Sequence, residues 1–299
     1  MTQRDDSRLL AIDIGGTSVK YGYWYQKLTD SGSFKTPETW PEMLAALLSL
    51  PAKINQPIQG VAVSLPGGVN TKIGEISGLS AVPYLNGFPI RQELSKQFKL
   101  PVTIQNDANC AGLAEAWLGN AKDVSSVALL IIGTGIGGSI VQDGHLLTGR
   151  DYFMGEFGYS IMNEQNETLS ELGAPVKMAR KYTRLSQSPE PVDAREIFER
   201  AKTGDELAQK CIEEMVHWLS IEAYNLITGF NPDRLLIGGG ISVRDDFLAM
   251  IRDQTNRLLQ QKGATVTTEI DRCKFCNASN LIGAVAQFLS EYPKLSVAE

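Results

Sequence analysis

The chain has 299 residues, of which 43% are hydrophobic, and it carries a net charge of −6 with a pI near 5.2. This length exceeds what one hydrophobic core usually supports, so we expect two domains. The acidic charge argues against nucleic acid or an anionic membrane surface as the main partner. A charged N-terminus and the lack of a long apolar run predict a cytoplasmic protein without a signal peptide or membrane span.

The chain opens with a compact apolar strand, 9–14, that carries Asp13 near its end. Gly15, Gly16 and Thr17 then turn the chain into a second, alternating strand, which predicts a β-hairpin. The turn therefore differs from the Walker and dinucleotide loops, whose glycines lead into a helix. Its N–H groups can bind phosphate oxygens, and Asp13 can hold magnesium through water. A plain glycine hairpin is the structural alternative.

The next segment predicts a mixture of strands and helices. One strand ends in a Leu-Pro-Gly-Gly turn containing Gly67, a turn suited to the edge of a ligand site. Residues 70–90 are rich in Gly, Ser, Pro and Asn, and we interpret them as an irregular, substrate-lining loop. The expected elements are a strand at 28–36, a helix at 41–50, a strand at 60–64 and a helix at 90–98.

The stretch 101–115 is where we place the chemistry. A short apolar run breaks there into Asn106 and Asp107, followed by a helix at 108–118. The junction of a buried strand and a helix is where α/β sheets present side chains to ligands. A carboxylate at this point can accept a proton from a substrate hydroxyl, so Asp107 is the candidate catalytic residue. The alternative is that Asp107 only caps the helix, since aspartate is a favoured N-cap.

The pattern of one strand, a glycine turn and a second strand then recurs at 126–141, with the turn at 133–135. Two matching hairpins about 120 residues apart indicate an internal duplication, with each copy heading one domain and both turns facing one cleft. A third glycine turn at 238–240 suggests close backbone packing or a flat ligand. The remaining expected elements are helices at 171–182, 194–201, 205–230, 247–259 and 278–289, and strands at 234–237 and 265–270.

The four cysteines are too few and too scattered for a disulfide framework. Cys273 and Cys276 have CxxC spacing, but a zinc site needs four ligands, and the sequence has no second CxxC and no paired histidines. A redox role stays open, because a thiol at a helix N-terminus can be reactive. We expect ordinary reduced cysteines.

Several of these segments resemble the motifs of a known superfamily. AIDIGGTSVKYG resembles the first phosphate motif of the sugar kinase, hsp70 and actin superfamily, LIIGTGIGGSIV the second, and LLIGGGIS the adenosine motif. QNDANCAGLAE, GEFGY and ASNLIGAVA are similar to motifs of the ROK family of bacterial sugar kinases and sugar-responsive repressors. The resemblance runs from Leu9 to about Phe288. It implies an α/β, two-domain, ribonuclease H-like fold with an interdomain active-site cleft, in which 1–120 plus 290–299 form the small domain and 121–289 the larger one.

The resemblance also implies ligands and residue roles. Asp107 corresponds to the general base, and Asn106 and Glu156 to residues that bind sugar hydroxyls. The ligands are ATP, Mg²⁺ and a small sugar, and we expect a homodimer. Further candidates at the sugar are Gly67, Tyr159 and Glu171. The candidates at ATP are Asp13, Gly15, Gly16, Thr17, Lys20, Gly133, Thr134, Gly135, Gly137, Gly239 and Gly240, with Asp13 holding Mg²⁺ through water.

The chain departs from the family pattern at GEFGY. Most ROK members carry ExGH and then a cysteine cluster that binds zinc, whereas Tyr159 stands here in the fourth position and 160–175 contains no cysteine or histidine. We therefore expect no structural zinc, and Glu171 is only a candidate for the family's second sugar-binding glutamate. The zinc-less form resembles β-glucoside kinases. Tyr159 could stack on an aglycone, or it could pack beneath the loop.

The sequence thus predicts an ATP-dependent phosphotransferase that acts on the 6-hydroxyl of a hexose or β-glucoside. An N-acetylmannosamine or fructose kinase of the same family stays open. A sugar-sensing repressor is disfavoured, because the few residues before the first strand contain no helix-turn-helix. A chaperone-like or structural ATPase would share the phosphate motifs but would not explain GEFGY.

Overall fold

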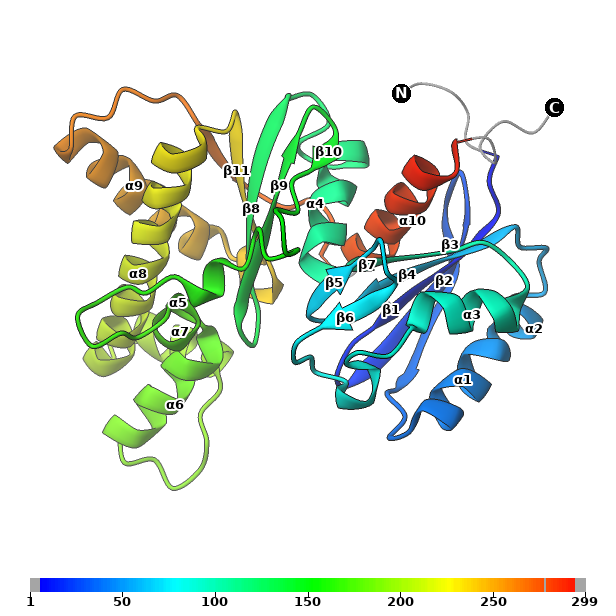
Figure 1. Cartoon of the computed structure of the whole chain (residues 1–299). Helices are drawn as coiled ribbons and strands as arrows, with labels where there is room; N and C mark the ends of the chain where they lie inside the picture. The colour runs from blue at the N-terminus through cyan, green and yellow to red at the C-terminus, as the bar shows by residue number, and fades with distance from the viewer. Residues whose placement is uncertain (1–5, 277, 294–299) are drawn as a thin grey trace. The chain divides into compact units, whose positions relative to one another are not determined.

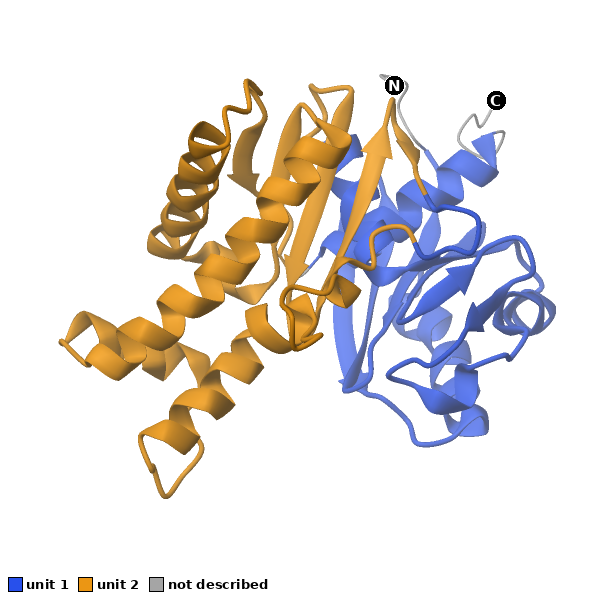
Figure 2. Cartoon of the chain, turned by 60° about the vertical axis from the view of Figure 1, so that its left-hand side comes forward, with its two compact units in different colours: residues 1–118, 148–153, 277–299 blue, residues 119–147, 154–276 orange. Residues whose placement is uncertain are grey.

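The computed structural model describes residues 6–276 and 278–293. The chain divides into two compact units, coloured separately in Figure 2. Unit 1 comprises 1–118, 148–153 and 277–299, and unit 2 comprises 119–147 and 154–276. The ends of the expected small domain, 1–5 and 294–299, lie outside the described residues.

Each unit is built on a five-stranded sheet. The strands of unit 1 are β1 (Leu9–Ile14), β2 (Ser18–Tyr25), β3 (Lys27–Lys35), β4 (Gly60–Leu65) and β7 (Val102–Asn106), and those of unit 2 are β8 (Ser126–Ile132), β9 (Ile136–Gln142), β10 (His145–Leu146), β11 (Arg234–Gly238) and β12 (Glu269–Arg272). The strand orders are β3-β2-β1-β4-β7 and β10-β9-β8-β11-β12. In both sheets the first three strands pair antiparallel and the others parallel. The two sheets thus share the topology that the predicted duplication requires, with one glycine-turn hairpin heading each unit.

Helices cover the sheet of unit 1. They are α1 (Trp40–Leu48), α2 (Leu50–Ile54), the 3₁₀ helix η1 (Pro83–Leu85), α3 (Ile90–Phe98), α4 (Asp107–Leu118) and α10 (Ser279–Glu291). Strands β1, β4 and β7 are buried along their whole length, as expected of parallel strands covered on both faces. In Figure 1, α4 and α10 lie on one side of this sheet and α1 to α3 on the other. The core on the α1 to α3 side includes Ile12, Val63, Met43 and Leu94.

The last helix corrects the expected domain boundary. The sequence places 278–289 in the larger domain, whereas α10 belongs to unit 1. The cause is close packing: a Cβ at Gly283 would lie 1.7 Å from the carbonyl oxygen of Cys110 in α4. In addition, the Phe288 ring packs directly over Gly60 of β4. The expectation that Gly283 lets this helix approach a neighbour is confirmed.

The segment 70–90 is more ordered than the sequence predicts. It contains most of a small hairpin, β5 (Gly68–Asn70) and β6 (Glu75–Ser77), followed by η1. The Asn70 side chain accepts the N–H groups of Lys72 and Ile73, so it closes the turn between the two strands. The buried side chain of Ile76 anchors the segment to the core of unit 1.

Unit 2 differs from expectation at two elements. The helix predicted over 171–182 is two helices, α5 (Leu169–Gly173) and α6 (Pro175–Leu185), because Pro175 disfavours helical geometry in the residue before it. The strand predicted over 265–270 is β12, which begins later. Its first residue, Glu269, pairs with Arg234, the first residue of β11, so earlier residues have no strand beside them.

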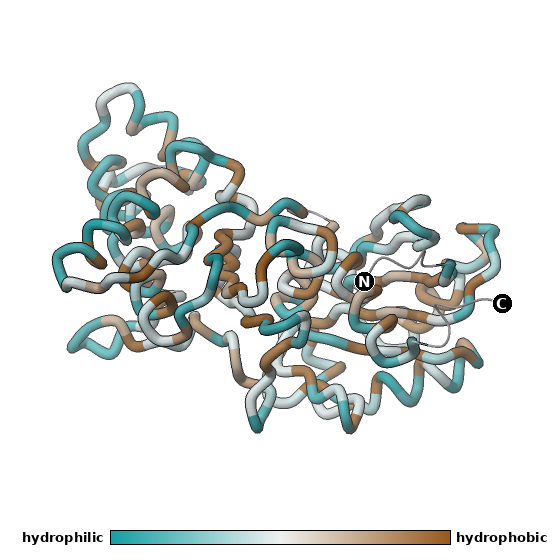
Figure 3. Tube along the Cα trace, turned by 90° about the horizontal axis from the view of Figure 1, so that it is seen from above, coloured by the Kyte–Doolittle hydropathy of each residue, from teal (hydrophilic) through white to brown (hydrophobic). Residues whose placement is uncertain are grey.

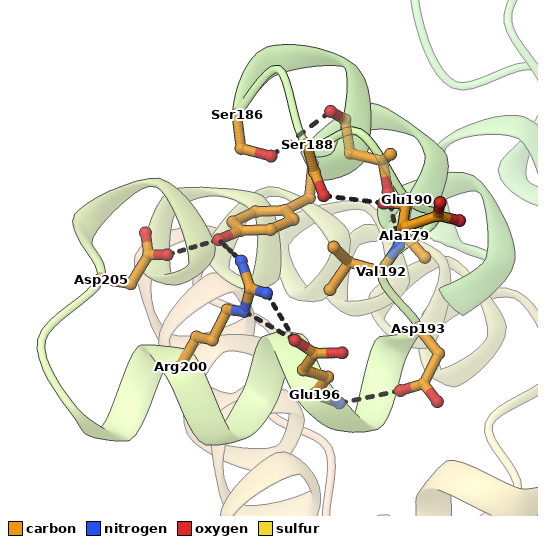
Figure 4. Close-up of polar contacts among 11 residues, drawn as sticks. Ala179, Ser186, Ser188, Glu190, Val192, Asp193, Glu196, Arg200 and Asp205 are labelled. Atoms are coloured by element: carbon orange, nitrogen blue, oxygen red, sulfur yellow. Dashed lines mark hydrogen bonds and ion pairs between the residues drawn. The ribbon is translucent and has the colours of Figure 1, made fainter.

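The other helices of unit 2 form its separate core with the sheet. They are the 3₁₀ helices η2 (Phe157–Tyr159) and η3 (Gly240–Val243), and α7 (Ala194–Lys202), α8 (Glu206–Phe230) and α9 (Asp245–Gln261). Figure 3 shows hydrophobic stretches inside the unit and hydrophilic turns at its outer end. The Tyr182 hydroxyl, which donates to Asp205 and accepts from Arg200 at 3.0 Å, ties α6 to α7 and to the N-cap of α8 (Figure 4). None of the described helices is both long and apolar enough to cross a membrane.

Candidate active site

Asn106 and Asp107 lie at the junction of β7 and α4 in unit 1. Asn106 immediately precedes the helix, and its Oδ1 accepts the Asn109 N–H at 3.0 Å, which is the bond an N-cap residue makes. Asp107 is the first residue of α4. Its Oδ1 accepts the Ala108 N–H at 2.8 Å and the Asn106 amide at 3.0 Å. The capping bond therefore belongs to Asn106, and capping alone does not account for Asp107.

Asn106 also connects the strand turn at Gly67 to this junction. Its amide donates to the Gly67 carbonyl oxygen at 2.9 Å, and Gly67 has a positive φ of 86° that favours glycine. Asn106 is itself held by Gln105, whose Oε1 accepts the Asn106 N–H at 2.8 Å. The structure thus brings together three predicted residues, Gly67, Asn106 and Asp107, and leaves the Asp107 carboxylate half-buried.

Asp13 is the buried carboxylate of unit 1. Its Oδ1 accepts the Ser64 hydroxyl at 2.8 Å and the Asn280 amide at 3.2 Å. Burial raises its pKa, and the two hydrogen bonds and the charge of Lys20 partly offset this effect. Its Oδ2 accepts no hydrogen bond from the described part of the chain. A buried carboxylate with one oxygen left for a hydrated cation fits Mg²⁺, which prefers oxygen ligands and retains several of its waters.

The first glycine turn exposes its backbone. Gly15 donates to the Ser18 carbonyl oxygen at 3.0 Å, which closes the turn. Gly16 and Thr17 are exposed, and within 6–276 and 278–293 their N–H groups find no acceptor. A Cβ at Gly16 would lie 2.8 Å from the Cβ of Ala81, so a side chain would be crowded there. Two adjacent free N–H groups suit the binding of a phosphate oxygen.

The second glycine turn has the same property in unit 2. Thr134 and Gly135 are exposed, and their N–H groups donate to none of the residues that the structure describes. Gly133 donates to the Gly135 carbonyl oxygen at 2.9 Å, and Ser170 accepts the Ile136 N–H at 3.0 Å and so fixes the end of the turn. The two turns share only Gly and Thr in their local sequence. Each nevertheless leaves two adjacent backbone N–H groups available as donors.

The third glycine turn follows β11. Gly239 has a φ of 92°, and a Cβ there would lie 2.0 Å from the Ile132 carbonyl oxygen of β8. Gly240 begins η3 with open space around its Cα, and Gly137 lies in β9 opposite Ile131. Close backbone packing therefore explains Gly239, whereas Gly240 has no steric requirement for glycine.

The GEFGY segment is pressed onto β9 by its two glycines. A Cβ at Gly155 would lie 2.4 Å from the Gly138 carbonyl oxygen, and one at Gly158 would lie 2.1 Å from that of Ile136. Glu156 is thereby held near the second glycine turn, half-buried, and burial raises its pKa. Such a carboxylate is a suitable acceptor for ligand hydroxyls.

The structure separates the two alternatives for Tyr159 and gives the Glu171 carboxylate a local partner. Tyr159 is 65% exposed, so packing beneath the loop does not account for it. The Glu171 carboxylate accepts the Thr168 N–H at 2.8 Å and completes a capping box for α5, and these bonds lower its pKa. A carboxylate that the sequence reasoning missed is Glu222, which is buried and accepts the Ser160 hydroxyl at 3.1 Å.

Metal ligands do not cluster around the GEFGY segment. Within the described residues, no group of three or more His, Cys, Asp or Glu side chains could hold a metal ion. Among the residues that the structure describes, the four cysteines form no disulfide; Cys110, Cys211 and Cys273 are buried, and Cys276 is exposed.

The model of the ROK family matches residues 9–291. The chain belongs to the ROK family. It is 34% identical to a β-glucoside kinase of Listeria monocytogenes, across 95% of this chain and 98% of that protein. It is 30% identical to an N-acetyl-D-glucosamine kinase of Salmonella paratyphi B, across 94% and 99%. A ROK family protein of Streptococcus pneumoniae, solved in complex with sucrose, superposes with a TM-score of 0.88 at 34% identity, covering 96% of this chain and 99% of that one.

These findings confirm two expectations for this ROK protein. The α/β, two-domain fold class of the sugar kinase, hsp70 and actin superfamily is confirmed, and so is the enzyme class, a sugar kinase. The names of the relatives differ in substrate. The residue roles and the sugar therefore belong to the proposal that follows.

Proposed function

We propose that this ROK protein transfers the γ-phosphoryl group of ATP to the 6-hydroxyl of a hexose or β-glucoside, with Asp107 as the general base. The observation that carries the proposal is the arrangement at the end of β7. Asn106 caps the helix, while two donors on Oδ1 orient the half-buried Asp107 carboxylate. A carboxylate fixed in this way at the C-terminal end of a parallel strand suits proton abstraction from a bound hydroxyl.

The residues of each unit have separate tasks in this reaction. In unit 1, Asp107 accepts the hydroxyl proton as the sugar oxygen bonds to phosphorus and the bond from phosphorus to the ADP oxygen breaks. The free N–H groups of Gly16 and Thr17 bind phosphate oxygens, as do those of Thr134 and Gly135 in unit 2. Mg²⁺ bound with ATP supplies positive charge that offsets the charge on the phosphates.

Asp13 and Glu156 complete the assignment. The Oδ2 atom of Asp13 would hold the hydrated metal through water, consistent with its lack of a donor from the described chain. Glu156 and Asn106 would bind sugar hydroxyls and orient the reacting one, and such positioning contributes much of the rate in phosphoryl transfer.

Asp107→Asn tests the base directly. The amide keeps the shape of the side chain but cannot accept the proton, so turnover should fall by about 10²–10⁴-fold while the sugar dissociation constant stays nearly unchanged. Asp193→Asn is the matched control, because Asp193 is a carboxylate that caps α7 by accepting the Glu196 N–H at 2.9 Å. Near-normal turnover of Asp107→Asn would refute the assignment.

A β-glucoside is the substrate we favour. Two observations support it: the Listeria relative is named for this substrate, and Tyr159 presents an exposed ring three residues after Glu156. Aromatic faces suit the apolar faces of sugar rings and aglycones. The crystallised relative bound sucrose, a two-ring sugar. N-acetylglucosamine is the second candidate, because the Salmonella relative is named for it.

A coupled kinase assay across sugars decides between these substrates. The panel is glucose, N-acetylglucosamine, N-acetylmannosamine, fructose, cellobiose and an aryl β-glucoside. We expect the highest kcat/KM for a β-glucoside, and we expect Tyr159→Ala to raise KM for the aryl β-glucoside more than for glucose. If glucose exceeds both β-glucosides in kcat/KM, the β-glucoside proposal is wrong and a glucokinase is favoured.

A further inference from the structure

The Asp13 carboxylate is held by donors from two distant parts of unit 1. Asp13 and Ser64 are register partners on the neighbouring parallel strands β1 and β4, so the Ser64 hydroxyl reaches Oδ1 at 2.8 Å. Asn280, the second residue of α10, donates to the same oxygen at 3.2 Å. Both donors engage Oδ1, and this asymmetry fixes which oxygen of the carboxylate is left for a ligand.

The orientation of the Asn280 amide is set by its own surroundings. The Ser279 hydroxyl donates to Asn280 Oδ1 at 3.2 Å, so the amide nitrogen is the atom that faces Asp13. The position of the helix is set one turn later, where Gly283 lets the α10 backbone approach that of Cys110. Asn280 therefore reaches Asp13 because α10 is docked closely on α4.

Ser64 is equally constrained. It is fully buried, and the thiol of Cys110, which lies one turn after Asp107 on α4, is beside it. Burial raises the pKa of that thiol well above its ordinary value, so it stays neutral. The Ser64 hydroxyl directs its proton toward the Asp13 carboxylate, to which it donates at 2.8 Å.

We propose that Ser64 and Asn280 are positioning residues that engage Oδ1 of Asp13 and so present Oδ2 to the hydrated Mg²⁺ of the bound nucleotide. This inference rests on the proposed kinase function. Neither residue needs to touch the metal, the nucleotide or the sugar. Removing either donor would let the carboxylate rotate and would weaken metal binding, while the sugar-binding residues of the β7 to α4 junction stay in place.

The test measures metal binding without turnover. Mn²⁺, a spectroscopic substitute for Mg²⁺, is titrated into the full-length protein with a non-hydrolysable ATP analogue and followed by electron paramagnetic resonance. Ser64→Ala and Asn280→Leu should each raise the Mn²⁺ dissociation constant by about tenfold, the range expected on losing a hydrogen bond to a charged group. In the kinase assay, the Mg²⁺ activation constant should rise in parallel and the sugar KM should change little.

Three controls separate positioning from a general structural role. Ser64→Thr keeps the hydroxyl and should bind Mn²⁺ as the unaltered protein does. Cys110→Ala removes a Ser64 contact but neither donor to Asp13, and it should do the same. In an Asp13→Asn background, Asn280→Leu should cause no further loss of Mn²⁺ affinity, because Asn280 affects the metal only through the Asp13 carboxylate.

Each outcome decides between the proposals. Unchanged Mn²⁺ affinity in folded Ser64→Ala and Asn280→Leu overturns the positioning role and leaves the kinase proposal intact. A parallel loss of sugar binding and metal binding overturns it too, because that indicates general damage to unit 1. If the unaltered protein binds no Mn²⁺ with the nucleotide analogue, the proposed function falls, and this inference falls with it.

Discussion

Gly283→Ala should test whether α10 is docked on α4 as tightly as the backbone distances indicate. The added Cβ would lie 1.7 Å from the carbonyl oxygen of Cys110 and 2.5 Å from its Cα. Since these are backbone atoms inside a helix, no side-chain rotation can relieve the contact. The two helices must move apart by more than 1 Å to bring the first distance to 3.0 Å.

The energetic cost of this movement can be bounded. Overpacking a close-packed interior typically costs about 1–3 kcal/mol. The shift also loosens the packing of fully buried Val285 and Phe288, so we expect a loss near the upper end, about 3 kcal/mol. For a chain of 299 residues, that corresponds to a fall of roughly 5 °C in the melting temperature. Asn280 should move away from Asp13 at the same time.

Gly229→Ala in α8 is the matched control. It is also a glycine-to-alanine change within a helix, but nothing lies within 4 Å of the position that the added methyl group would take, and alanine is favoured there by about 1 kcal/mol. Calorimetry of both variants should therefore show opposite signs, with Gly283→Ala less stable and Gly229→Ala as stable as the parent or more so. A Gly283→Ala protein that melts at or above the parent temperature would refute the close-docking argument.

Three further predictions concern charge and metal. Because burial raises the pKa of Glu156, its ionised form is lost as pH falls through that raised value. The sugar KM should therefore rise at acidic pH. Kinetics measured across pH should show that Glu156→Gln lacks this dependence. Burial likewise raises the pKa of Glu222, so its negative charge lowers the stability of the folded protein at neutral pH. Glu222→Gln should therefore be more stable than the parent near neutral pH. Denaturant titrations should show this advantage vanishing as pH falls below the ordinary pKa of a glutamate. Elemental analysis should find no stoichiometric zinc, and chelation followed by Mg²⁺ addition should abolish and restore activity; one tightly held zinc per chain would contradict this.

The parts of the fold that follow from local pattern could be predicted from the sequence. The strand at Leu9–Ile14 is a continuous apolar run ending at two glycines, and its counterpart at Ser126–Ile132 has the same form. Both hairpins were therefore predictable. So was the position of Asp107, because an apolar strand that breaks into Asn-Asp before a helix marks a sheet edge.

Some errors concern signals that were present in the sequence. Pro175 forbids a continuous helix across its position, and Thr168 with Glu171 has the spacing of a capping box, so the start of α5 was predictable as well. The same spacing argues that the Glu171 carboxylate is engaged by its own helix end. The role of Asn106 as the cap was open, because adjacent Asn and Asp compete for that position.

Other features depend on contacts between distant residues, which local pattern does not reveal. Asn280 lies 267 positions from Asp13, and their hydrogen bond requires the register of β1 with β4 and the docking of α10. Glu222 looks like one more charged residue of a long helix until the fold buries it against Ser160. The docking of α10 on unit 1 likewise depends on tertiary packing.

The placement of α10 in unit 1 has a consequence for synthesis on the ribosome. Unit 2 is made of 119–147 and 154–276, so all of its residues emerge before α10 does. Unit 1 begins with β1 but lacks the helix that covers β1 and β4 until nearly the whole chain has been translated. Until α10 is made, β1 and β4 lack this cover over one apolar face, and exposed apolar surface of this kind is prone to aggregation. Asp13 acquires its Asn280 donor only at that last stage, so a nascent or C-terminally shortened chain would lack one of the two hydrogen bonds that orient the proposed metal-binding carboxylate.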